Sequence, residues 1–174
     1  MLFENNIIDT TTLPNIDNVK FKPLLKTYKK LLLINSIIFF AILGAIAFAV
    51  YKLVDIENDI PDITIYITSA VLIFFFVVRL IFIQLGFPMK GYLLREHDII
   101  YKSGLINRRI IAIPINRIQH SEIRQSYIAR LLKIAKIKIF SAGGNTSDLS
   151  INGLSPELAQ QIKDYLSKTI SKNE

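Results

Sequence analysis

The chain has 174 residues and a formal net charge of +7, and 51% of its residues are hydrophobic. Its mean hydropathy of +0.39 is unusually high for a soluble domain of this size, so composition points first to a membrane protein. The absence of cysteine excludes disulfides, thiolate metal sites and a cysteine nucleophile.

Two long apolar runs account for the high hydropathy. Residues 31–50 contain no charge, and residues 63–83 contain only Arg79, near the end of the run. Each run matches the roughly 20 residues that a helix needs to cross a bilayer. Two buried helices of a soluble protein are a poorer match to this length, and a cleaved signal peptide would start earlier and be shorter. We therefore predict a two-helix transmembrane hairpin.

The flanking charges predict how the hairpin is oriented. A lysine cluster within 20–30 precedes the first run, and Lys90 and Arg95 follow the second, whereas the loop at 51–62 is acidic. Lysine and arginine mark the cytoplasmic side of a membrane. We expect a multi-pass protein of the bacterial inner membrane with both termini in the cytoplasm. The expected parts are an N-terminal segment (1–22), the hairpin (23–86, spans about 31–50 and 63–83) and a cytoplasmic domain (87–174).

Small residues in the two runs predict how the helices pair. The candidate packing residues are Ala41, Gly44, Ala45, Ala49, Ser69 and Ala70. Small side chains allow helices to approach closely, and we expect Ala45 to lie near Ser69 or Ala70. Counted from the inner ends, Asn35 is level with Arg79, whose guanidinium is expected to extend to the headgroups.

The region after the hairpin has the pattern of a small α+β domain. Strand-like stretches cover 91–95, 98–106, 109–115, 117–125, 136–142 and 148–152. A short helix is expected at 127–134, and a glycine-rich hairpin turn at 143–145. Strands followed by a closing helix predict an antiparallel sheet with the helix packed on it.

The closing helix has clear start signals. Ser155 is a good N-cap, Pro156 suits the first helical position, and Glu157 complements the helix dipole. The apolar stripe that should face the sheet consists of Leu158, Ile162, Tyr165, Leu166 and Ile170. This helix therefore needs a partner surface, which the sheet provides.

Residues 92–144 resemble the bacterial pleckstrin-homology-like (PH) domain of YdbS-like membrane proteins. The matching residues are Gly104, Leu105, Arg108, Arg109, Ile113, Pro114, Arg117, Ile118, Gln119, Arg130, Leu131, Leu132, Ala142, Gly143 and Gly144. Lys133 departs from the pattern, since glycine is expected before Ile134 and Ala135. The resemblance implies a bent antiparallel sheet closed by a C-terminal helix, and membrane assemblies that include larger relatives with several such domains.

No enzyme motif stands out in the sequence. The two histidines, His97 and His120, are assigned to a polar turn and to a strand face beside Glu122. The sequence has no metalloprotease, phosphate-loop or dinucleotide-binding motif, and two candidate ligands are too few for a metal site. We therefore expect no catalysis, no cofactor and no metal.

The stretch from Arg108 to Lys138 is strongly basic, with Glu122 as its single acid. We interpret it as a surface that faces lipid or a partner, formed by Arg108, Arg109, Arg117, Arg124, Lys133, Lys136 and Lys138. A plain solvated face is the competing interpretation. Nucleic acid is not expected, because a recognition helix and stacking aromatics are lacking.

The expected partners are therefore anionic lipids, bound non-specifically, and another membrane protein. The turn "REHD" holds two acids where phosphoinositide-binding PH domains carry a basic cluster, so that specificity does not carry over. We predict a membrane-anchored, non-catalytic interaction or assembly module of the cell envelope. The alternative is a subunit of a transport or stress-resistance complex in which the hairpin itself carries the function.

Overall fold

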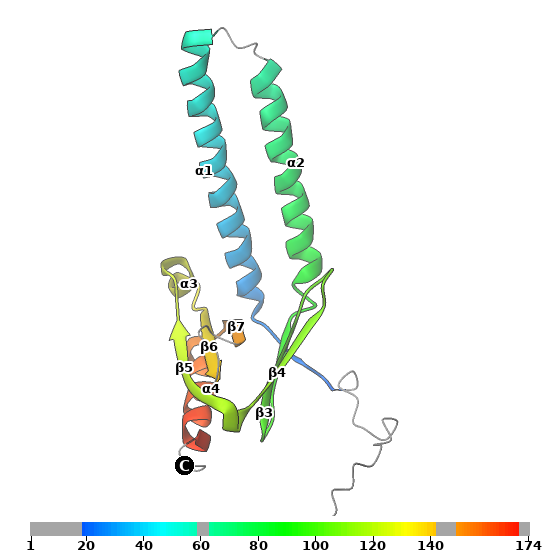
Figure 1. Cartoon of the computed structure of the whole chain (residues 1–174), viewed down its shortest axis with the longest axis vertical. Coiled ribbons are helices and arrows are strands. Elements are labelled where there is room, and N and C mark those ends of the chain that lie inside the picture. Colours follow the sequence, from blue (N-terminus) through cyan, green and yellow to red (C-terminus); the bar gives the residue numbers. More distant parts are fainter. Residues whose placement is uncertain (1–18, 59–62, 142–148, 171–174) are drawn as a thin grey trace, which may run out of the picture.

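The computed structural model describes residues 19–58, 63–141 and 149–170. Two long helices stand on a smaller domain of strands and short helices (Figure 1). The predicted turn at 143–145 and the middle of the acidic loop lie outside the described residues.

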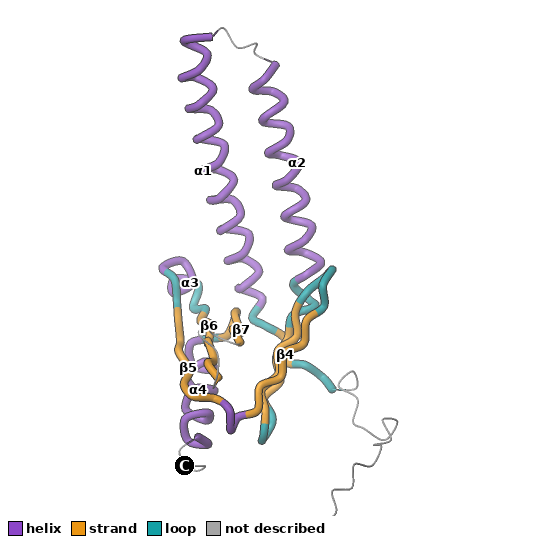
Figure 2. Tube along the Cα trace, in the orientation of Figure 1, coloured by secondary structure: helices purple, strands orange, loops and turns teal. Residues whose placement is uncertain are grey.

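The two long helices contain the predicted spans. Helix α1 (Lys26–Asn58) has 33 residues and α2 (Ile63–Gly86) has 24, and they run side by side (Figure 2). Both are long and apolar enough to cross a membrane. Their most apolar windows are only 11% and 0% buried within the chain. Large apolar side chains left this bare need a lipid or protein environment.

The strands form two antiparallel sheets. One has the order β1-β2-β3-β4 and the other β5-β6-β7. The strands are β1 (Lys22–Pro23), β2 (Gly91–Leu94), β3 (Asp98–Ser103), β4 (Arg109–Pro114), β5 (Ile118–Arg124), β6 (Ala135–Ser141) and β7 (Leu149–Leu154). The antiparallel arrangement and the closing helix are as predicted. The predicted single bent sheet is instead divided in two.

The division lies at the 3-10 turn η3 (Ile115–Arg117) between β4 and β5. Pro114 ends β4 and has no backbone N–H to donate to a neighbouring strand. The Ile115 N–H then donates to the His97 carbonyl at 2.9 Å, which ties the turn to the end of the first sheet. The chain therefore leaves one sheet and enters the other within three residues.

Both sheets share one hydrophobic core. Ile99 of β3 pairs with Ile113 of β4 in the first sheet, and Ile137 pairs with Ile151 in the second. All four are buried in the same cluster. The alternation of isoleucine and lysine along β6 places Ile137 and Ile139 in this core, because successive strand side chains point to opposite faces.

Helix α4 (Pro156–Ile170) closes the core as predicted. The Leu158 N–H donates to Ser155 Oγ at 3.1 Å, so Ser155 is the N-cap. Ile162 and Leu166 of the predicted stripe are buried, together with Ala159, while Tyr165 at the edge of the stripe is exposed. The stripe therefore packs the helix on the strands through its centre.

The foot of α1 belongs to the same core, which the sequence did not reveal. Tyr28 and Leu31 are buried in the cluster, and the Leu25 N–H donates to the Gly153 carbonyl on β7 at 2.9 Å. Just before the helix, Lys22 pairs with Tyr92 as part of β1. The first long helix and the strand before it are thus built into the domain.

The structure shows how Lys133 occupies the position where the family pattern has glycine. Helix α3 (Tyr127–Leu131) ends in a Schellman motif: the Ile134 N–H donates to the Ala129 carbonyl at 2.8 Å, and the Lys133 N–H to the Arg130 carbonyl at 3.1 Å. This motif requires a left-handed residue, and Lys133 has φ 52°. The turn is therefore the one that glycine favours, formed here by lysine.

Replacing Lys133 with glycine is expected to stabilise the protein by about 1 kcal/mol, because a left-handed non-glycine residue is strained by roughly that amount. The measurement is the free energy of unfolding of the full chain in detergent. The matched control is Lys163→Gly inside α4, where glycine is expected to destabilise by about 1 kcal/mol. A loss of stability at both positions would contradict the left-handed assignment.

Candidate interaction surface

The seven predicted basic residues lie in four places rather than on one surface. Arg108 and Arg109 are exposed where the β3–β4 turn enters β4, close to the inner end of α2. Arg124, Lys136 and Lys138 lie on the polar face of the second sheet, and Lys133 follows α3. Arg117 is in η3, at the end of the domain away from the long helices (Figure 1).

The polar face of the second sheet carries an ordered set of charges. Arg124 is opposite Lys136, and Glu122 is opposite Lys138. Arg124 Nε donates to Glu122 Oε2 at 2.7 Å. This hydrogen bond, followed by the nearby cations, lowers the pKa of Glu122. The charges on this face are thus the Glu122 carboxylate and the three cations of Arg124, Lys136 and Lys138. The net positive charge suits an anionic partner.

A small polar cavity of ≈200 Å³ lies between this face and the foot of α1. Arg124, Lys136 and Asn152 border it from the sheet, and Asn35 borders it from α1. The basic face therefore reaches the level at which α1 leaves the domain.

Two apolar prongs flank the inner ends of the long helices. The first is Ile106 in the β3–β4 turn, and the second is Tyr127 with Leu131 on α3; they are 81%, 75% and 68% exposed. The two elements that carry the prongs, the β3–β4 turn and α3, lie at the end of the domain nearest the helix hairpin (Figure 1). Tyr127 and Leu131 belong to the short helix predicted at 127–134, but their exposure was not predicted, because the exposure of an apolar residue is not visible in a sequence pattern.

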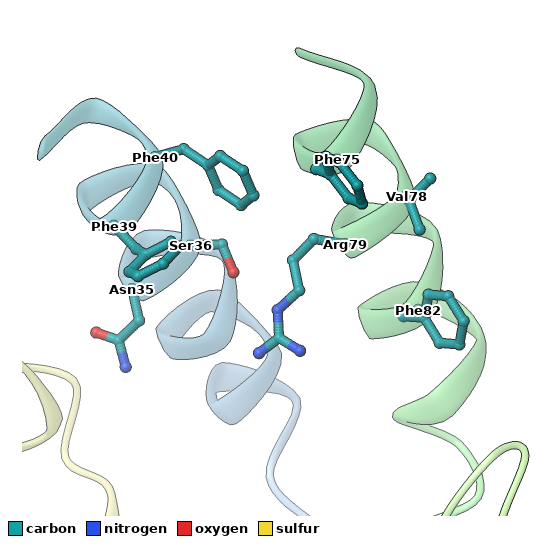
Figure 3. Close-up of a pocket in the computed structure, with 8 residues that line it drawn as sticks. All are labelled: Asn35, Ser36, Phe39, Phe40, Phe75, Val78, Arg79 and Phe82. Carbon is teal, nitrogen blue, oxygen red and sulfur yellow. The ribbon is translucent and has the colours of Figure 1, made fainter. Parts of the chain in front are cut away.

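A groove of ≈610 Å³ opens between α1 and α2 toward their inner ends. Asn35, Ser36, Phe40, Phe75 and Arg79 are among its lining residues. The Arg79 guanidinium extends from α2 into the space between the helices, and the Ser36 hydroxyl points toward it from α1 (Figure 3). The predicted common level of Asn35 and Arg79 thus corresponds to one groove.

The contact between α1 and α2 uses residues other than the predicted Ala41, Ala45 and Ala49. Phe40 and Phe76 meet edge to face with ring centroids 5.3 Å apart. Gly44 and Ser69 line a shallow groove at the same interface. The remaining predicted packing residues are Ala41, Ala45, Ala49 and Ala70, and all four are exposed. A close approach of Ala45 to Ser69 or Ala70 stays a prediction.

The histidines take structural positions. His120 stacks on Phe140 of the neighbouring strand, with ring centroids 4.2 Å apart, and His97 is exposed in the β2–β3 turn. Within the described ranges, no three histidine, aspartate or glutamate side chains come together as a metal site. The described surface therefore offers charge and apolar contact rather than a set of reacting groups.

Two antiparallel sheets with a closing C-terminal helix, joined to two apolar helices, define a PH-like protein with a hairpin. Residues 31–170 match the family model for the bacterial PH domain, so the chain belongs to that family. The match includes most of α1, all of α2 and the strands β2 to β7. No curated protein and no solved structure matches the sequence. PH-like domains generally act as non-catalytic interaction modules.

Proposed function

We propose that this chain is a membrane-anchored interaction module, in which the hairpin crosses the inner membrane and holds the PH-like domain against the cytoplasmic leaflet. The observation that carries the proposal is the foot of α1. Tyr28 and Leu31 are core residues of the domain and α1 continues from them without a break, so a helix in the bilayer would fix the orientation of the sheets.

In this orientation the two prongs enter the leaflet. Ile106 and Leu131 would bury apolar surface among the lipid chains. The β3–β4 turn and α3, which carry them, lie on opposite sides of the hairpin (Figure 1). Arg108 and Arg109 follow the first prong, and Lys133 follows the second. Cations at the headgroup level each contribute about 1 kcal/mol on an anionic leaflet. Lipid contact is therefore non-specific at this surface.

The polar face of the second sheet remains for a protein partner. Its positive balance favours an acidic surface on another membrane protein, and the YdbS-like resemblance suggests a larger relative with several PH-like domains. A transport role is less well supported, because Arg79 is the only charge in the two predicted spans. Crosslinking from Lys138 in native membranes, followed by mass spectrometry, would identify the partner.

The docking of the domain on the leaflet can be tested with single fluorescent labels, because the chain has no cysteine of its own. Ile106→Cys, Leu131→Cys and His97→Cys variants are labelled with a polarity-sensitive dye and reconstituted in vesicles that contain phosphatidylglycerol. We expect blue-shifted emission, quenched by brominated lipid, at positions 106 and 131. His97 is the control, because the β2–β3 turn that contains it lies at the opposite end of β3 from the β3–β4 turn that contains Ile106.

Labels at all three positions with the same aqueous emission would overturn the proposed orientation. A label at Leu131 that responds while Ile106 does not would place only α3 on the leaflet and contradict the two-prong contact. Folding of each labelled variant is checked by circular dichroism. We expect all three variants to fold, because exposed positions contribute little to stability.

A further inference from the structure

The groove between the long helices contains a cation, Arg79. Among the described residues no carboxylate forms an ion pair with Arg79, whereas Arg95 pairs with Asp98 and Arg124 pairs with Glu122. A charged side chain inside a helix hairpin is costly unless it is paired or hydrated. Arg79 therefore needs an anion or water in the groove.

Neighbouring groups make an anion the better occupant. Lys90 lies close to Arg79, and burial followed by repulsion from Arg79 lowers the pKa of Lys90. On the other helix, Asn35 lines the groove with its amide directed away from Arg79 (Figure 3), and the buried Ser36 hydroxyl donates to the Leu32 carbonyl at 2.8 Å, so Arg79 supplies the donors for an anion. The arginine N–H groups match the oxygens of a phosphate.

The walls of the groove identify the rest of the occupant. The phenylalanines among the lining residues are Phe39, Phe40, Phe75 and Phe82. Free phosphate would leave the faces of these rings that line the groove uncovered, whereas an amphiphile would cover them with hydrocarbon. The volume of ≈610 Å³ is within the range of small-molecule sites.

The depth of Arg79 suits a lipid headgroup. Arg79 is seven residues before the end of α2 at Gly86, or about 10 Å along the helix. An arginine at this depth reaches the headgroup layer with its side chain. Basic pockets between membrane helices on the cytoplasmic side are a recognised way of binding anionic lipids.

We propose that the inner groove between α1 and α2 binds one anionic phospholipid, with its phosphate on Arg79 and its hydrocarbon along the phenylalanines. The site rests on the proposed membrane span of the hairpin, and it differs from the non-specific contact of the prongs. It would fill the space between the two helices and neutralise the cation there.

The test uses the full chain, reconstituted in vesicles of equal parts phosphatidylcholine and phosphatidylglycerol. The chain is extracted in mild detergent, and the retained lipid is identified by native mass spectrometry. We expect one retained phosphatidylglycerol, with Arg79→Leu reducing its occupancy about tenfold or more, as expected for loss of a charge-assisted pair. Arg79→Lys should be intermediate, because lysine keeps the charge but not the planar fork.

Lys163→Leu on α4 removes the same charge far from the groove and should leave lipid retention unchanged. The lipid site would be overturned if the parent retained phosphatidylcholine as well as it retains phosphatidylglycerol. It would also be overturned if the Arg79→Leu variant retained as much phosphatidylglycerol as the parent. A competing result is that added glycerol phosphate displaces the lipid completely, which would show a phosphate site without hydrocarbon recognition. If neither the parent nor the Arg79→Leu variant retains lipid, and the parent is a dimer while the variant is a monomer, the groove would be assigned to a second copy of the chain.

This result is separable from the orientation test. If the labels at Ile106 and Leu131 fail to enter the leaflet while Arg79 still controls lipid retention, the orientation proposal fails and the lipid site stands. If the labels respond and Arg79→Leu changes nothing, the lipid site fails alone.

Discussion

Replacing Gly153 with valine is expected to lower the free energy of unfolding by about 2–5 kcal/mol, combining left-handed strain with overpacking. Gly153 has φ +80°, and a Cβ there would lie 2.7 Å from Cγ and Cδ1 of the Tyr28 ring. Because the Gly153 carbonyl also accepts the hydrogen bond from Leu25, the substitution acts at the joint between α1 and the domain.

The measurement is unfolding of the full chain in detergent, followed by circular dichroism. The matched control is Gly44→Val on α1, where a new Cβ meets nothing within 4 Å and glycine is already a poor helix former. We expect the midpoint denaturant concentration for unfolding of the control to be equal to or higher than that of the parent. Equal stability of the Gly153→Val protein and the parent would contradict the tight contact with Tyr28.

The second large effect is expected for Ile113→Asp. Ile113 is 6% exposed and pairs with the fully buried Ile99, so the new carboxylate would be placed in the shared core without a partner. A substitution of this kind typically costs 4–5 kcal/mol or more, roughly the whole stability of a marginal domain. We expect loss of the folded domain, seen as proteolysis of residues 87–174 while the hairpin stays in the membrane.

Ala112→Asp is the control for this substitution. It is the preceding residue of the same strand, it is exposed, and an aspartate there keeps its water. A protease-resistant Ile113→Asp protein would show that this part of the first sheet is not packed as the core requires.

Much of the fold could be predicted from local patterns. Long apolar runs indicated the two helices, the lysine–isoleucine alternation indicated β6, and Ser155 with Pro156 indicated the start of α4. These signals work because helix and strand periodicity and capping depend on neighbouring residues. The interruption at η3 was missed, since a strand that ends in proline resembles a strand that bends.

The candidate sites were predicted less completely. Arg79 and Asn35 were placed at one level from their depths alone, but the groove that joins them depends on how α1 and α2 face each other. The basic residues were treated as one surface, although Arg108 precedes one end of β4 and Arg117 is in η3, which follows the other end. Charge density in a sequence does not show which face of a folded sheet carries each side chain.

The sequence by itself determined the apolar hairpin, the antiparallel α+β class and the family resemblance, because each is a property of short or contiguous stretches. Only the tertiary structure decided that α1 is part of the core. Leu25 and Tyr28 meet Gly153 across most of the chain, and such distant contacts are selected by shape and packing, which leave no periodic signal. The left-handed Lys133 shows the same limit, because the Schellman turn, not the residue type, sets its backbone conformation.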